Sequence, residues 1–132
     1  MAEVVAREVF FEVGIDTVEV RSAGIHAFEG SPVSPEANQA LRTNGWEFTG
    51  KSVLLDYSMA SKCKRILCMT QFHKAAVREI LDKKGHDTSH VVCLNEDRDV
   101  SDPIGCGQPV YEKLLKELES LIRIEIKNFV EN

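Results

Sequence analysis

The sequence predicts a small α/β domain in which helices cover both faces of a doubly wound parallel sheet. Short apolar runs, typical of buried strands, alternate along the chain with longer segments of helical periodicity. The chain has 132 residues, of which 43% are hydrophobic, and this composition suits one domain over residues 1–132 with a substantial core. No internal repeat or low-complexity tract interrupts the pattern.

The first half of the chain predicts two helices separated by one strand. Residues 2–12 carry their apolar side chains on one face, and Gly14 follows as a helix-ending glycine. Residues 17–21 alternate polar and apolar side chains, as a strand with one solvated face does. Ser34 and Pro35 begin the second helix as its N-cap and first residue. The expected inward side chains are Ala2, Val5, Ala6, Val9 and Val13 in the first helix and Ala37, Ala40 and Leu41 in the second.

The second half predicts two strands buried on both faces, each followed by a helix. The strands are the apolar runs 65–69 and 91–94, and a short helix around residues 57–60 precedes the first of them. Thr70 caps the helix after the first strand, and Pro109 opens the last helix. The expected inward side chains are Phe72, Ala76, Val77, Ile80 and Leu81 in the former helix and Val110, Leu114, Leu118, Leu121 and Ile122 in the latter.

The composition excludes several function classes. The formal net charge is −5 and the lysines and arginines are scattered, so we expect no nucleic-acid partner. No apolar run approaches the roughly 18–20 residues that a membrane-spanning helix needs, so we expect no membrane partner. Residues 1–5 lack the basic start of a secretory signal, which favours a cytoplasmic location.

The four cysteines fit that compartment, and their spacing does not indicate a metal site. None belongs to a C-x-x-C pair, and His86 with His90 supplies only half of a zinc site. We therefore expect no metal and no cofactor. Cys68 and Cys93 lie in the predicted buried strands, where they are expected to act as small hydrophobic side chains.

One residue with catalytic potential follows the last predicted strand. The carboxyl ends of parallel strands face a common crevice, and Asp102 lies in the polar loop at that end. An aspartate held ahead of a proline, here Pro103, can give a proton to a leaving oxygen as a general acid. The same dipeptide is also a common turn, so by itself it does not establish catalysis.

Several short motifs occur in one order along the chain, and together they carry a family resemblance. They resemble the low-molecular-weight protein tyrosine phosphatases, a family that includes bacterial arginine phosphatases, over essentially the whole chain. The resemblance implies a phosphotyrosine-phosphatase-I-like fold, a phosphorylated protein as substrate and hydrolysis through a cysteine–phosphate intermediate. The motifs are Met-Ala-Glu-Val-Val at positions 1–5, Val20-Arg21-Ser22-Ala23-Gly24, Ser34-Pro35-Glu36-Ala37, Cys68-Met69-Thr70, Asp102-Pro103-Ile104-Gly105 and Tyr111.

The resemblance also implies that the nucleophile is missing. Members of the family begin with a strand and a C-x5-R-S phosphate loop, which leads into Pro-Met-Ala-Glu, whereas this chain starts at that methionine. No internal C-x5-R replaces the loop. We therefore expect the first, central strand, the catalytic cysteine and the phosphate-binding arginine to be absent, and these 132 residues to be inactive by themselves.

The absent strand has a structural consequence. In the family's strand order it lies between the strand at 18–21 and the strand at 65–69, so both would have an unpaired edge. Unpaired edges are costly in water. Two repairs are open: the flanking strands pair directly, or a second chain fills the gap by forming a homodimer through the exposed strand edges. We expect direct pairing, within a chain that also associates with itself.

Three positions receive roles by resemblance. Asp102 corresponds to the general acid that protonates the leaving group. Phe28 falls where relatives often place an aromatic side chain that lines the substrate site. Alternatively, Phe28 is an apolar loop residue that packs over the sheet. Ile104 and Gly105 occupy positions where tyrosine-directed relatives carry aromatic residues. This difference indicates that the chain is more similar to the bacterial members of the family. The resemblance places Ile104 at the substrate-binding position.

Two other functions remain open. One is a natural non-catalytic phosphatase relative that binds a partner protein. The other is an arsenate reductase of the related thiol-cascade type, which needs further cysteines near the third strand. Cys68 is close to that place, but Ala75 and Ala76 stand where its partner would be needed, so this function ranks below the phosphatase one.

Overall fold

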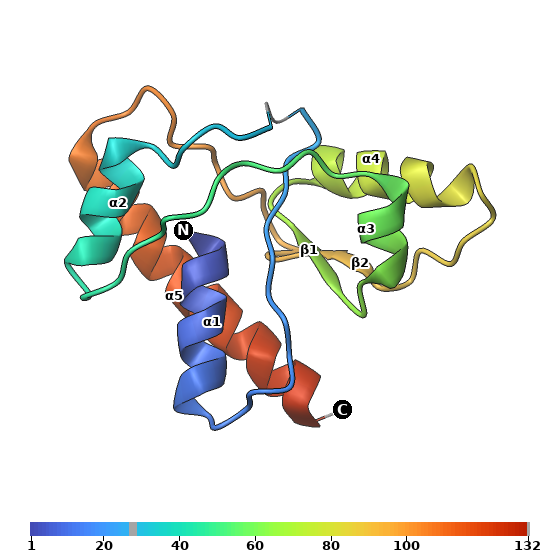
Figure 1. Ribbon diagram of the computed structural model, residues 1–132, viewed down its shortest axis with the longest axis horizontal. Helices are drawn as coiled ribbons and strands as arrows, with labels where there is room; N and C mark the ends of the chain where they lie inside the picture. Colours follow the sequence, from blue (N-terminus) through green and yellow to red (C-terminus); the bar gives the residue numbers. More distant parts are fainter. Residues whose placement is uncertain (27–28, 132) are drawn as a thin grey trace. The chain divides into compact units, whose positions relative to one another are not determined.

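The structure is a computed structural model that describes residues 1–26 and 29–131 (Figure 1). Over these residues the chain divides into two compact units, each made of separate segments. Unit 1 comprises Met1–Ser22, Gly30–Ser52 and Pro103–Asn132, and unit 2 comprises Ala23–Glu29 and Val53–Asp102. The expectation of a single domain over residues 1–132 stays a prediction. The elements are α1 (Ala2–Glu12), α2 (Pro35–Arg42), α3 (Tyr57–Lys62), β1 (Ile66–Cys68), α4 (Gln71–Asp82), β2 (Val91–Cys93) and α5 (Gln108–Glu131).

Unit 1 is a helical unit in which α5 packs against both α1 and α2 (Figure 1). The predicted start of α2 is confirmed, because the Ser34 hydroxyl accepts a hydrogen bond from the Ala37 amide at 3.2 Å. Phe10 and Phe129 meet edge to face, with ring centroids 6.1 Å apart. The core side chains of the three helices are Val4, Val5, Val9, Phe10, Ala37, Ala40, Leu41, Tyr111, Leu114, Leu115, Leu118, Ile122 and Ile126.

Unit 2 is built around two parallel strands with α4 as their connection. The register pairs Ile66 with Val91 and Cys68 with Cys93. The predicted cap of α4 is confirmed, since the Thr70 hydroxyl accepts from the His73 amide at 3.0 Å. Helices α3 and α4 pack together, and the core consists of Ala60, Cys68, Val77, Leu81 and Val91. The α/β class is therefore confirmed, with a parallel sheet of two strands in the described part of the chain.

The prediction of a strand at residues 17–21 is wrong. A strand exists only where a neighbouring strand satisfies its N–H and C=O groups, and none of the described segments lies beside these residues as a strand. The Arg7 side chain donates a hydrogen bond to the Val20 carbonyl at 3.0 Å, so this backbone is held by a side chain and not by a neighbouring strand. The expected direct pairing of this segment with the strand at 65–69 is also wrong, because β1 pairs only with β2 among the described residues.

Three side chains that were predicted to face the core are exposed, because of their positions around or beyond the helices. Phe72 is 67% exposed, because it precedes the buried Val77 by five residues and so points about 140° away from it. Val110 is 47% exposed, since the buried face of α5 begins at its neighbour Tyr111. Val13 is 54% exposed and lies beyond the last residue of α1.

The side chains of β1 are only partly buried, although the apolar run 65–69 predicted a strand buried on both faces. Ile66 and Leu67 are half-buried and Cys68 is buried. The difference follows from the sheet, in which β1 pairs with one strand instead of two over the described residues. Within the described ranges, no helix is long and apolar enough to cross a membrane.

Candidate active site

The candidate site lies in unit 2, where the carboxyl ends of β1 and β2 meet. After β1 the chain passes through Met69 and Thr70 into α4. After β2 it continues into the loop 94–102, which we call the acid loop. Because the two strands are parallel, both of these connections start at the same edge of the sheet.

Backbone hydrogen bonds attach the acid loop, near both of its ends, to the last residue of β1 and to the residue that follows it. The Leu94 amide donates to the Cys68 carbonyl at 2.8 Å, and the Val100 amide donates to the Met69 carbonyl at 2.8 Å. The side chains of Leu94 and Val100 are buried. The loop therefore leaves the sheet edge and returns to it within a few residues.

Two carboxylates add further attachments. Glu96 accepts from the Cys93 amide at 2.9 Å, and its second oxygen lies 3.6 Å from the Lys74 ammonium. The Cys93 amide, helped by the charge of Lys74, holds the pKa of Glu96 below its ordinary value. Asp99 accepts from the Gln71 amide at the start of α4, at 3.0 Å. Neither residue has a role predicted from the sequence, although both lie in the loop expected to be polar.

Asp102 is an exposed residue at the end of the acid loop, two positions beyond Val100. The next residues belong to unit 1 and form a tight turn. The Cys106 amide donates to the Pro103 carbonyl at 2.9 Å, and Gly105 has φ +79°, both features of a type II turn. Ile104 occupies the second position of that turn and is 76% exposed. Phe28 lies outside the described residues.

The cysteines of the sheet are unsuited to nucleophilic attack. Cys68 and Cys93 are neighbours in the strand register and are both buried, as the sequence predicts. Burial raises the pKa of the Cys68 thiol to about 11 and also raises that of Cys93. Since the thiolate is the reactive species, burial and the raised pKa of both thiols disfavour nucleophilic attack by these two cysteines. Within the part of the chain that the structure describes, no group of three or more histidine, cysteine, aspartate or glutamate residues could hold a metal ion.

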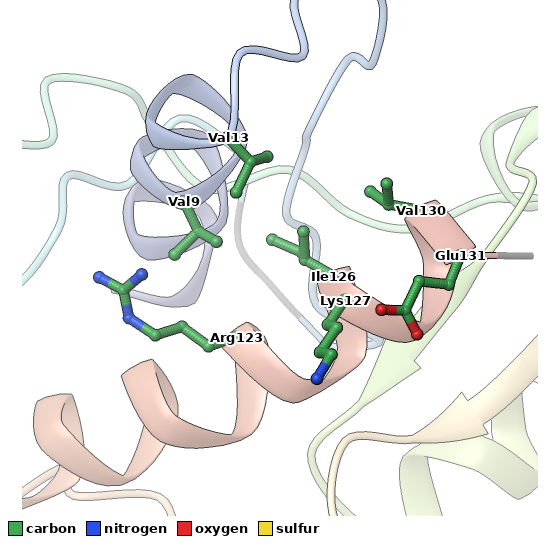
Figure 2. Close-up of a pocket in the computed structure, with 7 residues that line it drawn as sticks. All are labelled: Val9, Val13, Arg123, Ile126, Lys127, Val130 and Glu131. Atoms are coloured by element: carbon green, nitrogen blue, oxygen red, sulfur yellow. The ribbon is translucent and has the colours of Figure 1, made fainter.

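Unit 1 contains a separate shallow groove between α1 and α5, with a volume of about 290 Å³ (Figure 2). Figure 2 shows Val9 of α1 and Val13, the residue after α1, facing Ile126 of α5 across it. Arg123 at its rim already binds Glu12 and Glu119. Four of its seven lining residues are apolar, and its charged Arg123 is already bound to two carboxylates, so we interpret the groove as a packing gap between two helices and not as a candidate active site. The remaining lining residues are Lys127, Val130 and Glu131.

Comparison with known proteins identifies the family. Residues 1–131 match the family described as low molecular weight phosphotyrosine protein phosphatase. A protein-arginine-phosphatase of Geobacillus stearothermophilus is 34% identical over 107 residues, which are 80% of this chain and 72% of the relative. A protein-arginine-phosphatase of Bacillus subtilis (strain 168) is 30% identical over 128 residues, which are 93% of this chain and 83% of the relative.

A solved structure agrees with these matches. The crystal structure of a YwlE mutant from Bacillus subtilis superposes with a TM-score of 0.88 at 27% identity, covering 97% of this chain and 87% of that chain. The α/β arrangement of helices and parallel strands is thus shared with that solved structure. The chain belongs to the low molecular weight phosphotyrosine protein phosphatase family.

Proposed function

We propose that this chain belongs to a cytoplasmic protein phosphatase whose substrate is phosphoarginine. The observation that carries the proposal is its 34% and 30% identity with two protein-arginine-phosphatases. The assignment of phosphoarginine is also supported by Ile104 and Gly105, because these residues occupy positions where tyrosine-directed relatives carry aromatic side chains. The free thiols of the described residues suit a reducing compartment.

The proposed reaction has two steps. A cysteine thiolate attacks phosphorus, so that an S–P bond forms and the P–N bond to the guanidine breaks. Asp102 gives its proton to the departing nitrogen. Water then attacks phosphorus, so that a P–O bond forms and the S–P bond breaks. The Asp102 carboxylate takes a proton from that water, and phosphate leaves as the thiolate is restored. Backbone amides and a bidentate arginine would hold the phosphoryl oxygens throughout.

The first step needs a cysteine and an arginine in the spacing C-x5-R, which these 132 residues do not contain. We therefore propose that the chain does not catalyse the reaction by itself. The position six residues after each cysteine is occupied by Met69 after Cys63, Lys74 after Cys68, Asp99 after Cys93 and Glu112 after Cys106.

The lack of a C-x5-R spacing in these 132 residues also favours a second candidate. This candidate is a non-catalytic member of the family that binds a partner protein. Asp102 without a nucleophile is then a turn residue ahead of Pro103. The two candidates differ in whether restoring a phosphate loop restores turnover.

The test compares the 132-residue chain with an extended chain that carries a strand and a C-x5-R-S loop ahead of Met1. Both are assayed with a phosphoarginine peptide and with p-nitrophenyl phosphate. The matched control is the extended chain with its loop cysteine changed to serine. We expect turnover in the extended chain alone and loss of it in the control. Since one oxyanion donor is worth about 10²–10³ in rate, the 132-residue chain should stay near background.

The outcomes separate the candidates. An extended chain that hydrolyses neither substrate would refute the phosphatase and leave the partner-binding candidate. Turnover of p-nitrophenyl phosphate without turnover of the phosphoarginine peptide would refute the substrate class only. Activity of the 132-residue chain within about tenfold of the extended chain would refute the need for the added loop.

A further inference from the structure

We propose that Asp99 is a positioning residue for Asp102. Its carboxylate holds the acid loop against the first turn of α4 and so determines where the acid lies. This inference rests on the proposed function, because positioning matters only if Asp102 transfers a proton.

The bond from Asp99 to α4 satisfies a group that the helix cannot satisfy itself. The first amides of a helix have no partner within it. In α4 the Thr70 hydroxyl serves the His73 amide, and the Asp99 carboxylate serves the Gln71 amide at 3.0 Å. A negative charge at this end is also favoured by the helix dipole. The contact therefore joins a loop side chain to a fixed point of the fold.

Asp99 acts together with its neighbour. The Val100 amide donates to the Met69 carbonyl at 2.8 Å, and the Val100 side chain is 4% exposed. Two consecutive loop residues thus bind the turn that joins β1 to α4. Asp102 follows after two more residues, so its Cα can lie no more than about 7 Å from that of Val100.

The remaining carboxylates of the loop are placed differently. Glu96 binds the Cys93 amide near the beginning of the loop, six residues before Asp102. The Asp97 carboxylate makes no hydrogen bond or ion pair with the described residues, and only its backbone amide bonds to Asn95. Asp97 is therefore a matched control, with the same side chain in the same loop.

The need for such a residue follows from the chemistry. A displacement of about 1 Å in a reacting group can cost about 10² in rate, and a loop is the most mobile place for a catalytic acid. Asp99 is itself exposed, so its bond competes with water. Its loss should then shift the loop while the core of unit 2 stays folded.

The experiment uses the extended chain with Asp99→Ala, Asp99→Asn and Asp97→Ala, and a series of aryl phosphates. For poor leaving groups, which need protonation, we expect Asp99→Ala to lower kcat by about 10–10². For good leaving groups, which depart without a proton, we expect a loss of less than about threefold. The asparagine variant keeps the accepting oxygen and should recover to within about threefold of wild type, as should Asp97→Ala. The urea midpoint should be unchanged in Asp97→Ala and Asp99→Asn and should fall only slightly in Asp99→Ala, which loses one exposed hydrogen bond.

Hydrogen exchange in the 132-residue chain gives an independent measurement. The amides of Gln71 and Val100 should lose protection in Asp99→Ala and keep it in Asp99→Asn. An active extended chain in which Asp99→Ala slows good and poor leaving groups equally would overturn the positioning role alone. Unchanged exchange at both amides would overturn it as well. An extended wild-type chain without activity would overturn the proposed function, and the positioning role with it.

Discussion

Arg123 donates hydrogen bonds to both carboxylate oxygens of Glu12, at 2.7 and 3.3 Å, and so joins the end of α1 to α5. A further bond of 3.1 Å goes to Glu119, one turn earlier on α5. The bonds from Arg123 lower the pKa of Glu12 below its ordinary 4.5. The same contacts raise the pKa of Arg123. This charge-assisted link holds two helices of unit 1 together.

The first prediction concerns the pH dependence of that link. Because the folded-state pKa of Glu12 is lowered, its stabilising contribution is present above the unfolded pKa of about 4.5 and is lost as pH falls through the folded pKa. Glu12→Gln should lower the urea midpoint at pH 7 and have no effect well below pH 4. The matched control is Glu8→Gln on the same helix, whose carboxylate has no bond to the described residues. An equal effect of Glu12→Gln at both pH values would contradict this account.

The second prediction concerns thiol reactivity. Cys106 and Cys63 are exposed, whereas Cys68 and Cys93 are buried. At a pKa of about 11, only about one Cys68 thiol in a thousand is ionised at pH 8. A short pulse of iodoacetamide, followed by mass spectrometry, should label Cys106 and Cys63 in the folded chain. The two buried cysteines should react only in urea, where all four should react at similar rates. Rapid labelling of Cys68 in the folded chain would contradict its burial.

The third prediction tests whether the 132 residues form one cooperative domain. Leu41 of unit 1 and Leu81 of unit 2 are both fully buried. Each change to alanine should cost about 2–5 kcal/mol of unfolding free energy. If the units unfold together, either change lowers the same single transition, seen alike by the fluorescence of Trp46 in unit 1 and by circular dichroism. Two transitions, with Leu81→Ala leaving the Trp46 signal unmoved, would show two separate domains.

Helix boundaries could be predicted because their causes are local. Ser34 and Thr70 each cap a helix through a bond to an amide three residues ahead, as their positions in the sequence indicated. Gly14 and Gly85 end helices with φ of +78° and +69°, a conformation that suits glycine. These interactions span a few residues and do not depend on the rest of the fold.

The features that could not be predicted depend on distant partners. Residues 17–21 have the composition of a strand, but a strand requires a neighbour, and the pattern of one segment does not supply it. Asp102 could be identified from Asp-Pro and the family motifs. Asp99 could not, because its role appears only when the fold brings it to the Gln71 amide, 28 positions away in the sequence.

The fourth prediction concerns the proton that Asp102 is proposed to supply. In the extended chain, Asp102→Asn removes the proton but keeps the size of the side chain. Turnover of poor leaving groups should fall by about 10²–10⁴, and turnover of good ones much less. The measurement is kcat across a series of aryl phosphates of rising phenol pKa. Equal losses across the series would return Asp102 to the role of a turn residue.

The last prediction concerns the edge of the sheet. The Ile66 amide donates to the His90 carbonyl at 3.0 Å, and the Cys68 carbonyl accepts from the Leu94 amide at 2.8 Å, so both residues bond toward β2. In a parallel pair the intervening residue bonds the opposite way, so the N–H and C=O of Leu67 point to the other edge. No strand in the described ranges pairs with that edge. An unpaired edge is a template for a second chain, and we expect the 132-residue chain to form a homodimer through it.

Sedimentation at several concentrations measures this association, and two variants identify the surface. Leu67→Pro removes the outward N–H and should abolish the dimer, because proline cannot donate to a ladder. Leu67→Ala keeps that N–H and should weaken the dimer only through lost apolar contact. If both variants associate like the wild type, the dimer uses another surface. If the wild type is a monomer at every concentration, water satisfies the backbone groups of this edge and the homodimer is refuted.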